Sequence, residues 1–213
     1  MGTITKGILG GFSGKVGTVI GGRWKGIDYM RSVASRRRDA QTLPQLEQRA
    51  RFRLMLSFLQ PIFGLLMVGF RTFALRKTGI NAAMSYNLKN AIAGEYPLYS
   101  IAYNQVLISR GDLTGAVNAS VTSLSSGELS FSWIDNSGIG KAKGSDRVIL
   151  LAYCAALKAS IYTTGSGLRS AMELSFDVAD FAGETVQTWI GFISADGKSV
   201  SDSVFVGQVS VLE

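Results

Sequence analysis

The pattern of hydrophobic and polar positions changes twice along the chain. Residues 1–43 are rich in glycine and alternate only over short runs, which is typical of turns and short strands. Residues 44–97 repeat hydrophobic positions at a helical spacing, and residues 98–213 alternate with a period of two. We therefore predict an α+β fold in three parts: a glycine-rich basic arm with a β-hairpin, a helical region, and an all-β immunoglobulin-like or fibronectin-like sandwich.

The first part contains the predicted hairpin. Two short strands, residues 14–20 and 23–33, flank Gly21-Gly22, and a Gly-Gly pair permits the turns that match strand twist. Two interpretations stay open: an amphipathic hairpin that packs Trp24 on its neighbours, or a surface that binds single-stranded nucleic acid by stacking and phosphate contact. The interleaved basic and aromatic side chains that suggest the second are Arg23, Trp24, Lys25, Tyr29 and Arg31.

The helical region has a clear start and an internal break. Thr42 is a suitable N-cap, and Pro44 fits a first helical turn because its missing N–H is not needed there. Pro61 should kink or break the helix near residue 60, because it lacks the donor that the helix interior requires. We expect helices over residues 46–60, 61–75 and 81–93.

Residues 54–70 form an uncharged apolar stretch between Arg53 and Arg71. The stretch resembles a membrane span, but it is shorter than the typical ~20 residues and contains Pro61. We therefore favour a helix pair buried in a core or in a subunit interface, since one helical hairpin cannot cover so much apolar surface. This predicts self-association through a candidate assembly interface of Leu54, Phe58, Ile62, Phe63, Leu66 and Phe70.

The third part, residues 98–213, reads as short strands separated by Gly, Ser and Asp turns. We expect strands over residues 98–108, 117–124, 129–134, 147–155, 159–163, 171–176, 185–194 and 203–212. The predicted core residues of the sandwich are Trp133, Tyr153, Phe176 and Trp189. The loop 135–146 carries glycines and lysines and is either a solvated loop or an anion-gripping one.

Composition removes most catalytic chemistry. The chain has no His and a single Cys, so His-dependent triads, His-metal sites and Cys pairs are excluded. Cys154 lies in an apolar stretch and reads as a core residue. Neither a Walker loop nor a GxGxxG motif occurs. We expect no catalytic residue, no cofactor and no metal, and therefore a protein that is not an enzyme. No secretory signal is visible, which predicts a cytoplasmic protein or one in an assembled particle.

Charge is segregated along the chain. Residues 1–78 hold 14 Lys and Arg against three Asp and Glu, a net charge of +11, and residues 79–213 hold eight against 12, a net charge of −4. This asymmetry predicts contact with nucleic acid or with an acidic protein face, including that of another copy. Besides the hairpin cations, the candidate contact residues are Arg36, Arg37, Arg38, Arg49, Arg51 and Arg53.

Several runs resemble an uncharacterised bacterial family of about this length that carries no assigned function. These runs are GGFSGKVGTVIG (10–21), WKGIDYMRS (24–32), QRARF (48–52), AAMSYN (82–87), SRGDL (109–113) and WIGFIS (189–194). Residues 14–53 are similar, more loosely, to prophage-encoded proteins suspected of being virion or tail components. The leading hypothesis is a self-assembling structural homo-oligomer with a displayed sandwich. A nucleic-acid-binding protein is the alternative, and a membrane-associated protein is less favoured.

Overall fold

The computed structural model describes residues 2–4, 7, 10–34, 42–74 and 77–213. It divides into two compact units, which we call the N-terminal unit (Met1–Thr42) and the C-terminal unit (Leu43–Glu213). The helical region and the sandwich, which were predicted as separate parts, lie in the same unit.

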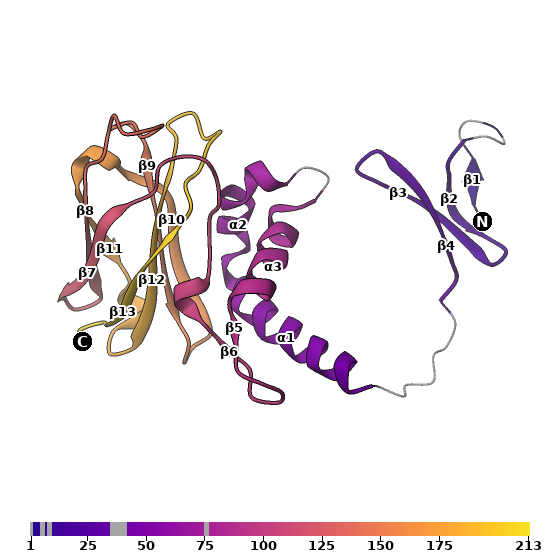
Figure 1. The fold of residues 1–213 in the computed structure, drawn as a ribbon, viewed down its shortest axis with the longest axis horizontal. Helices are drawn as coiled ribbons and strands as arrows, with labels where there is room; N and C mark the ends of the chain where they lie inside the picture. The colour runs from indigo at the N-terminus through magenta and orange to yellow at the C-terminus, as the bar shows by residue number, and fades with distance from the viewer. Residues whose placement is uncertain (1, 5–6, 8–9, 35–41, 75–76) are drawn as a thin grey trace. The chain divides into compact units, whose positions relative to one another are not determined.

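The N-terminal unit is a four-stranded antiparallel sheet in the order β1-β2-β3-β4 (Figure 1). Its strands are β1 (Thr3–Ile4), β2 (Phe12–Val16), β3 (Val19–Trp24) and β4 (Ile27–Ser32). The hairpin is present, but the predicted position of its turn is wrong. Gly21 and Gly22 lie inside β3, and the chain turns at residues 17–18 and 25–26, where Gly17 and Gly26 have φ of 58° and 84°.

Gly21 and Gly22 are needed because side chains of neighbouring strands approach their backbone closely, and not because the chain turns there. A Cβ on Gly21 would collide with the backbone oxygen and the ring of Phe12, and a Cβ on Gly22 would lie 2.8 Å from the Tyr29 ring. Both glycines therefore leave room for an aromatic ring on a neighbouring strand. A turn and a close approach both require glycine, so the sequence pattern did not distinguish them.

Helices open the C-terminal unit. They are α1 (Leu43–Leu59), α2 (Phe63–Gly69) and α3 (Gly79–Asn90). A short 3-10 segment, Gln60–Ile62, separates α1 from α2 and contains Pro61, as the sequence predicts. Thr78 caps α3, because its hydroxyl accepts a hydrogen bond of 3.2 Å from the backbone N–H of Asn81.

The predicted β-sandwich is confirmed. One sheet has the order β10-β9-β12-β13 and the other the order β11-β8-β7, and every neighbouring pair is antiparallel. The strands are β7 (Val117–Ser125), β8 (Glu128–Ile134), β9 (Arg147–Cys154), β10 (Ala159–Leu168), β11 (Glu173–Asp177), β12 (Thr185–Ile193) and β13 (Val204–Ser210).

The strand predicted over residues 98–108 is wrong. Only β6 (Ser100–Ile101) is extended there, and it pairs with β5 (Ile92–Ala93) rather than with the sandwich. The Asn87 side chain holds the end of this segment, because its Nδ2 donates to the Leu107 oxygen at 2.9 Å and its Oδ1 accepts from the Leu107 N–H at 3.0 Å. An amide of α3 thus takes the place of a strand partner.

Strands β9 and β12 are buried on both faces. Side chains of one parity, such as Leu150 and Phe192, pack between the two sheets, while those of the other parity, such as Leu151 and Trp189, pack against the helices. Figure 1 shows the three helices beside this sheet, so the C-terminal unit has three layers. Burial on two faces explains why β9 is almost continuously apolar rather than alternating.

The candidate assembly interface is therefore corrected. Phe58, Ile62, Leu66 and Phe70 are at most 1% exposed, because the chain's own sheet covers them. The Phe58 ring lies 4.7 Å from the Tyr153 ring, edge to face, and 5.9 Å from the Trp189 ring.

The two remaining residues of the predicted interface are at least partly buried, and the predicted core residues of the sandwich lie in two different clusters. Phe63 is partly buried against the helix-facing cluster and Leu54 is half-buried, so neither offers an open interface. Trp133 and Phe176 lie between the sheets as predicted. Tyr153 and Trp189 are buried but face the helices instead.

The helical stretch Leu43–Gly69 is long and apolar enough to cross a membrane. The core helix of a globular domain meets the same length and composition criteria, and one side of this stretch, including Phe58, Ile62 and Leu66, is buried in the cluster that contains Tyr153 and Trp189 of the chain's own sheet. Its contacts are those of a core helix, in agreement with the favoured interpretation of the sequence.

A buried ion pair closes one end of the sandwich. Arg169 and Asp146 are both fully buried, and Arg169 Nε donates to Asp146 Oδ2 at 3.1 Å. The same guanidinium donates to Asn136 Oδ1 and to the Thr114 oxygen, and its carbon lies 3.7 Å from the centre of the Phe192 ring. A buried cation with this many partners fixes the surrounding loops.

Replacing Arg169 by Met is expected to destabilise the protein by about 3–5 kcal/mol, because it leaves the Asp146 carboxylate buried without its cation. Urea unfolding followed by circular dichroism measures this change. The matched control is Lys141→Ala, which removes the cation of the exposed Lys141–Asp112 pair and should change stability little. Equal effects of the two substitutions would contradict a structural role for Arg169.

Alkaline pH should weaken the helix-facing core. Burial, with a further contribution from Tyr103, raises the pKa of Tyr153 from 10.0 to about 12. The folded protein therefore keeps the phenol proton while the unfolded chain loses it, so stability is full below pH 10 and declines as pH rises toward 12. Urea unfolding at pH 9 to 11 measures this effect. The free energy of unfolding of the Tyr153→Phe variant should fall less steeply with pH than that of the wild type. The free energy of unfolding of the Tyr29→Phe variant should fall as that of the wild type does.

Candidate functional site

The N-terminal sheet has no buried side chain of its own. Among the described residues up to residue 42, only Gly21 is buried. Residues opposite one another on neighbouring strands point to the same face, so Trp24 and Ile27 share one face. Met30 pairs with Gly21 and lies on the other. Trp24 is 52% exposed and Met30 is 72% exposed. Both faces of this sheet therefore present uncovered apolar side chains.

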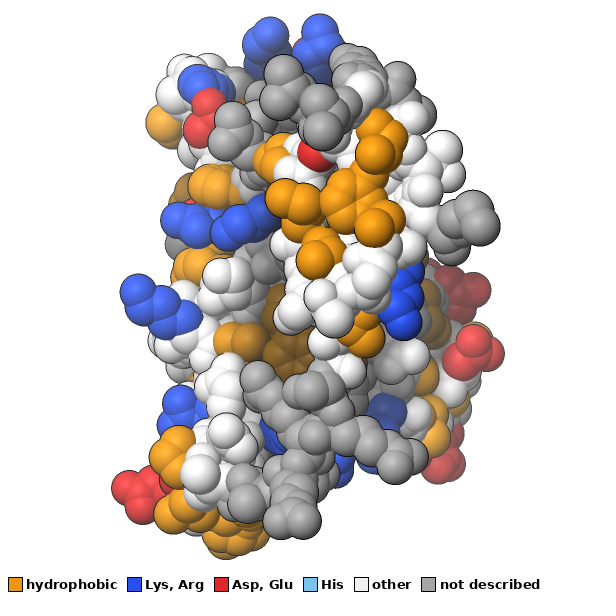
Figure 2. All heavy atoms as spheres, turned by 90° about the vertical axis from the view of Figure 1, so that its right-hand side faces the viewer, with side chains coloured by type: hydrophobic (Ala, Val, Ile, Leu, Met, Phe, Trp, Pro, Cys, Tyr) orange, Lys and Arg blue, Asp and Glu red, His pale blue; other side chains and the backbone are white. Residues whose placement is uncertain are grey.

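Cations lie among these apolar side chains. Arg23 forms an exposed ion pair of 3.6 Å with Asp28 on the adjacent strand, and Arg31 is exposed on β4 opposite Ile20. Lys25 occupies the second turn with a φ of 46°. In Figure 2, hydrophobic side chains lie among Lys and Arg side chains on the surface. The predicted Arg36, Arg37 and Arg38 fall outside the described residues.

The other predicted cations lie on the exposed face of α1. Arg49 and Arg53 are one turn apart and line an open groove of about 530 Å³ together with Phe52. Arg51 points elsewhere, since its guanidinium lies 4.8 Å from the centre of the Tyr99 ring. The structure thus brings two of these three arginines together.

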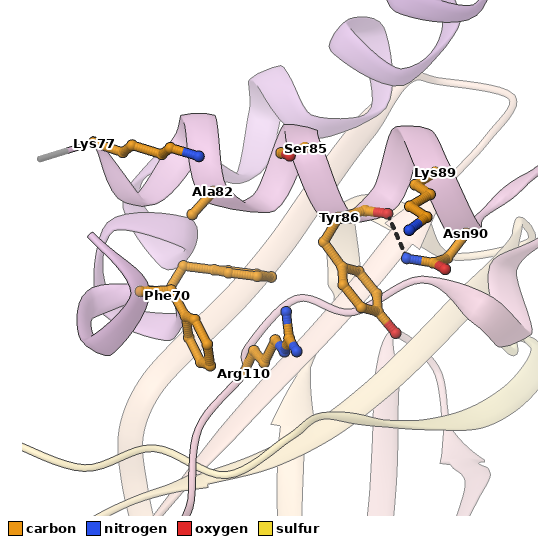
Figure 3. Close-up of a pocket in the computed structure, with 9 residues that line it drawn as sticks. Phe70, Lys77, Ala82, Ser85, Tyr86, Lys89, Asn90 and Arg110 are labelled. Carbon is orange, nitrogen blue, oxygen red and sulfur yellow. Dashed lines mark hydrogen bonds between the residues drawn. The ribbon is translucent and has the colours of Figure 1, made fainter. Parts of the chain in front are cut away.

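A cationic pocket was not predicted from the sequence. It has a volume of about 430 Å³ and lies between α3 and the segment that carries Arg110 (Figure 3). The residues that line it are Phe70, Phe73, Lys77, Ala82, Ser85, Tyr86, Lys89, Asn90 and Arg110. Its cations are spread over positions 77 to 110 of the sequence and form no motif. The one signal in the sequence was the helical spacing from Ala82 to Lys89, which places these residues on one face of α3.

The loop 135–146 is anchored rather than freely solvated. Asn136 and Asp146 are buried in the Arg169 network, and Lys141 pairs with Asp112. Hydrogen bonding and charge from Lys141 lower the pKa of Asp112. The neighbouring pocket, of about 400 Å³, contains Asp146 and Asp196 as well as Lys141 and Lys143, so its mixed charges do not select an anion.

Within the described part of the chain, no three Cys, Asp or Glu side chains are grouped as metal ligands would be. Cys154 is fully buried, with its sulfur 4.0 Å from Glu184 Oε2. The candidate functional features are therefore surfaces: the uncovered N-terminal sheet, the α1 groove and the cationic pocket.

Comparison with known proteins adds a family and two similar folds. A family model described as a family of unknown function (DUF6266) matches residues 11–207, which confirms the predicted resemblance to an uncharacterised family. No curated protein matches the chain. The similarity to prophage proteins stays a prediction.

Two solved structures are similar at low identity. The fn3 domain of the human collagen alpha-1(XX) chain has 13% identity and a TM-score of 0.37, over 47% of this chain and 88% of that one. The FN1-FN3 domains of chicken CNTN1 have 12% identity and a TM-score of 0.35, over 56% of this chain and 38% of that one.

Proposed function

The chain belongs to the DUF6266 family, and we propose that it is a non-enzymatic structural subunit that assembles with other copies of itself through its N-terminal sheet and displays its sandwich. One observation carries this proposal: the N-terminal sheet has exposed apolar side chains on both faces, and none of the described residues of this unit forms a layer over them. The candidate interface thus moves from the helices to this sheet.

A sheet of this kind gains stability only from a covering layer. Fully burying a large apolar side chain contributes on the order of 1.5–3 kcal/mol. The N-terminal unit, Met1–Thr42, is close to the size of about 40 residues below which a chain usually needs a disulfide, a metal or association to fold. The N-terminal unit has no cysteine, and its uncovered apolar side chains are Ile4, Val16, Trp24, Ile27, Tyr29 and Met30.

The opposite net charges of the two parts of the chain favour a head-to-tail contact between copies over a symmetric contact between two N-terminal units. Residues 1–42 hold eight Lys and Arg against two Asp and Glu, a net charge of +6, so two of these sheets would repel each other. Residues 79–213 carry a net charge of −4 and offer the opposite sign. A contact between the N-terminal unit of one copy and the sandwich of the next is heterologous, and such contacts build rings or filaments. Tail-like and filament-like assemblies have this form.

Light scattering on purified protein tests the assembly. The wild type should have a mass well above the 22.8 kDa of one chain, and the double variant Trp24→Ser, Met30→Ser should shift toward that mass. Leu98→Ser is the matched control, because Leu98 is 83% exposed in the C-terminal unit, and it should leave the assembly intact. A wild type that stays monomeric through tens of micromolar would refute the proposal.

The groove on α1 favours a second candidate, binding of single-stranded nucleic acid. Arg49 and Arg53 would contact phosphates while the exposed Phe52 ring stacks on a base. Filter binding of a DNA oligonucleotide should fall steeply with added salt, and Arg49→Ala with Arg53→Ala should flatten that dependence. Arg147→Ala, an exposed arginine at the start of β9, serves as the control. Failure to retain the oligonucleotide at low salt would exclude this candidate.

A further inference from the structure

The cationic pocket has two walls, one formed by α3 and the other by Phe70 and Arg110. Ala82, Ser85, Tyr86 and Lys89 follow one another at helical spacing along one face of α3. Figure 3 shows these side chains facing Arg110 and Phe70 across the pocket. Phe70 is almost fully buried and belongs to the helix-facing core, so this wall of the pocket is anchored in that core.

Arg110 is held in place through its backbone and its side chain. Its N–H donates to the Gly69 oxygen at 2.9 Å, and its own carbonyl accepts from Thr72 Oγ1 at 3.3 Å. Its guanidinium carbon lies 4.5 Å from the centre of the Phe73 ring and 5.0 Å from that of the Tyr86 ring. A guanidinium fixed between rings keeps its N–H groups available, which is how an arginine is prepared for an oxyanion.

Three cations line the pocket. Lys77, Lys89 and Arg110 all contribute to it, and the described residues that line it include no Asp or Glu. Among the described residues, no carboxylate lies within ion-pair distance of Lys89 or Arg110. Cations gathered in one cavity repel each other, and a bound anion would remove that repulsion. The Ser85 hydroxyl adds a neutral donor.

We propose that this pocket binds a phosphate-bearing small molecule. Its phosphates would contact Lys89 and Arg110, since a guanidinium binds such oxygens in a bidentate manner and an ammonium binds them as a point charge. The volume of about 430 Å³ lies within the range of ligand pockets and exceeds the need of a single phosphate. The remaining space, beside Phe70 and Ala82, would hold the apolar or planar part of the ligand.

Isothermal titration calorimetry of the full-length protein with inorganic pyrophosphate and with ADP tests the proposal. Both should bind, and Lys89→Gln should weaken each by about tenfold, the effect expected for loss of one charge-assisted contact. Lys89 lies on an exposed helix face, so this substitution spares the fold. Arg110→Gln should weaken binding at least as much, with circular dichroism confirming that the variant is folded.

Lys198→Gln is the control, because Lys198 is exposed and lies outside the pocket, and it should bind as the wild type does. Tighter binding of ADP than of pyrophosphate would identify an organic phosphate, and equal binding would identify the phosphate groups alone. Absence of binding by both probes at millimolar concentration would overturn the proposal, as would equal binding by wild type and Lys89→Gln. The self-assembly proposal does not depend on this result, since the pocket and the N-terminal sheet share no residue.

Discussion

Burial of strands β9 and β12 on both faces is the constraint on which the C-terminal unit depends. A sandwich strand normally faces its partner sheet on one side and water on the other, and its side chains alternate accordingly. Here the second face carries Leu151, Tyr153 and Trp189, which pack against the helices and against Tyr103 in the segment that follows them. The helices in turn bury Phe58 and Leu66 in the same cluster. Sheet and helices therefore stabilise each other as one unit.

Two cores of different character result from this arrangement. The cluster between the sheets contains Trp133 and Phe131 and ends at the buried Arg169, whose guanidinium lies over the Phe192 ring. The helix-facing cluster is aromatic around Phe58 and extends through Phe70 to the wall of the cationic pocket. Because Phe70 and Arg110 are fixed by their contacts, this wall of the pocket is formed without any ligand.

The N-terminal unit follows the opposite design. Its strands pair as regularly as those of the sandwich, yet no second layer within the described residues of this unit covers either face. Glycines within β3 allow Phe12 and Tyr29 to lie close to the backbone, but these rings do not amount to a core. The C-terminal unit buries two large apolar clusters, whereas the described residues of the N-terminal unit bury no side chain. The proposed assembly surface is therefore this sheet rather than the helices, whose large side chains Phe58, Ile62, Leu66 and Phe70 are buried.

The sequence alone predicted local features of the fold, namely the positions of strands and of the break between helices. The period of two located the strands 117–124 and 129–134 within a residue or two, and Pro61 located the helix break, because periodicity and backbone chemistry act between near neighbours. Only the tertiary structure decided which surface covers which. The apolar stretch 54–70 indicated burial but not the burying partner, and Arg169 joins residues 23 to 55 positions away. Such contacts depend on how whole layers stack, and that information is not present in any single segment.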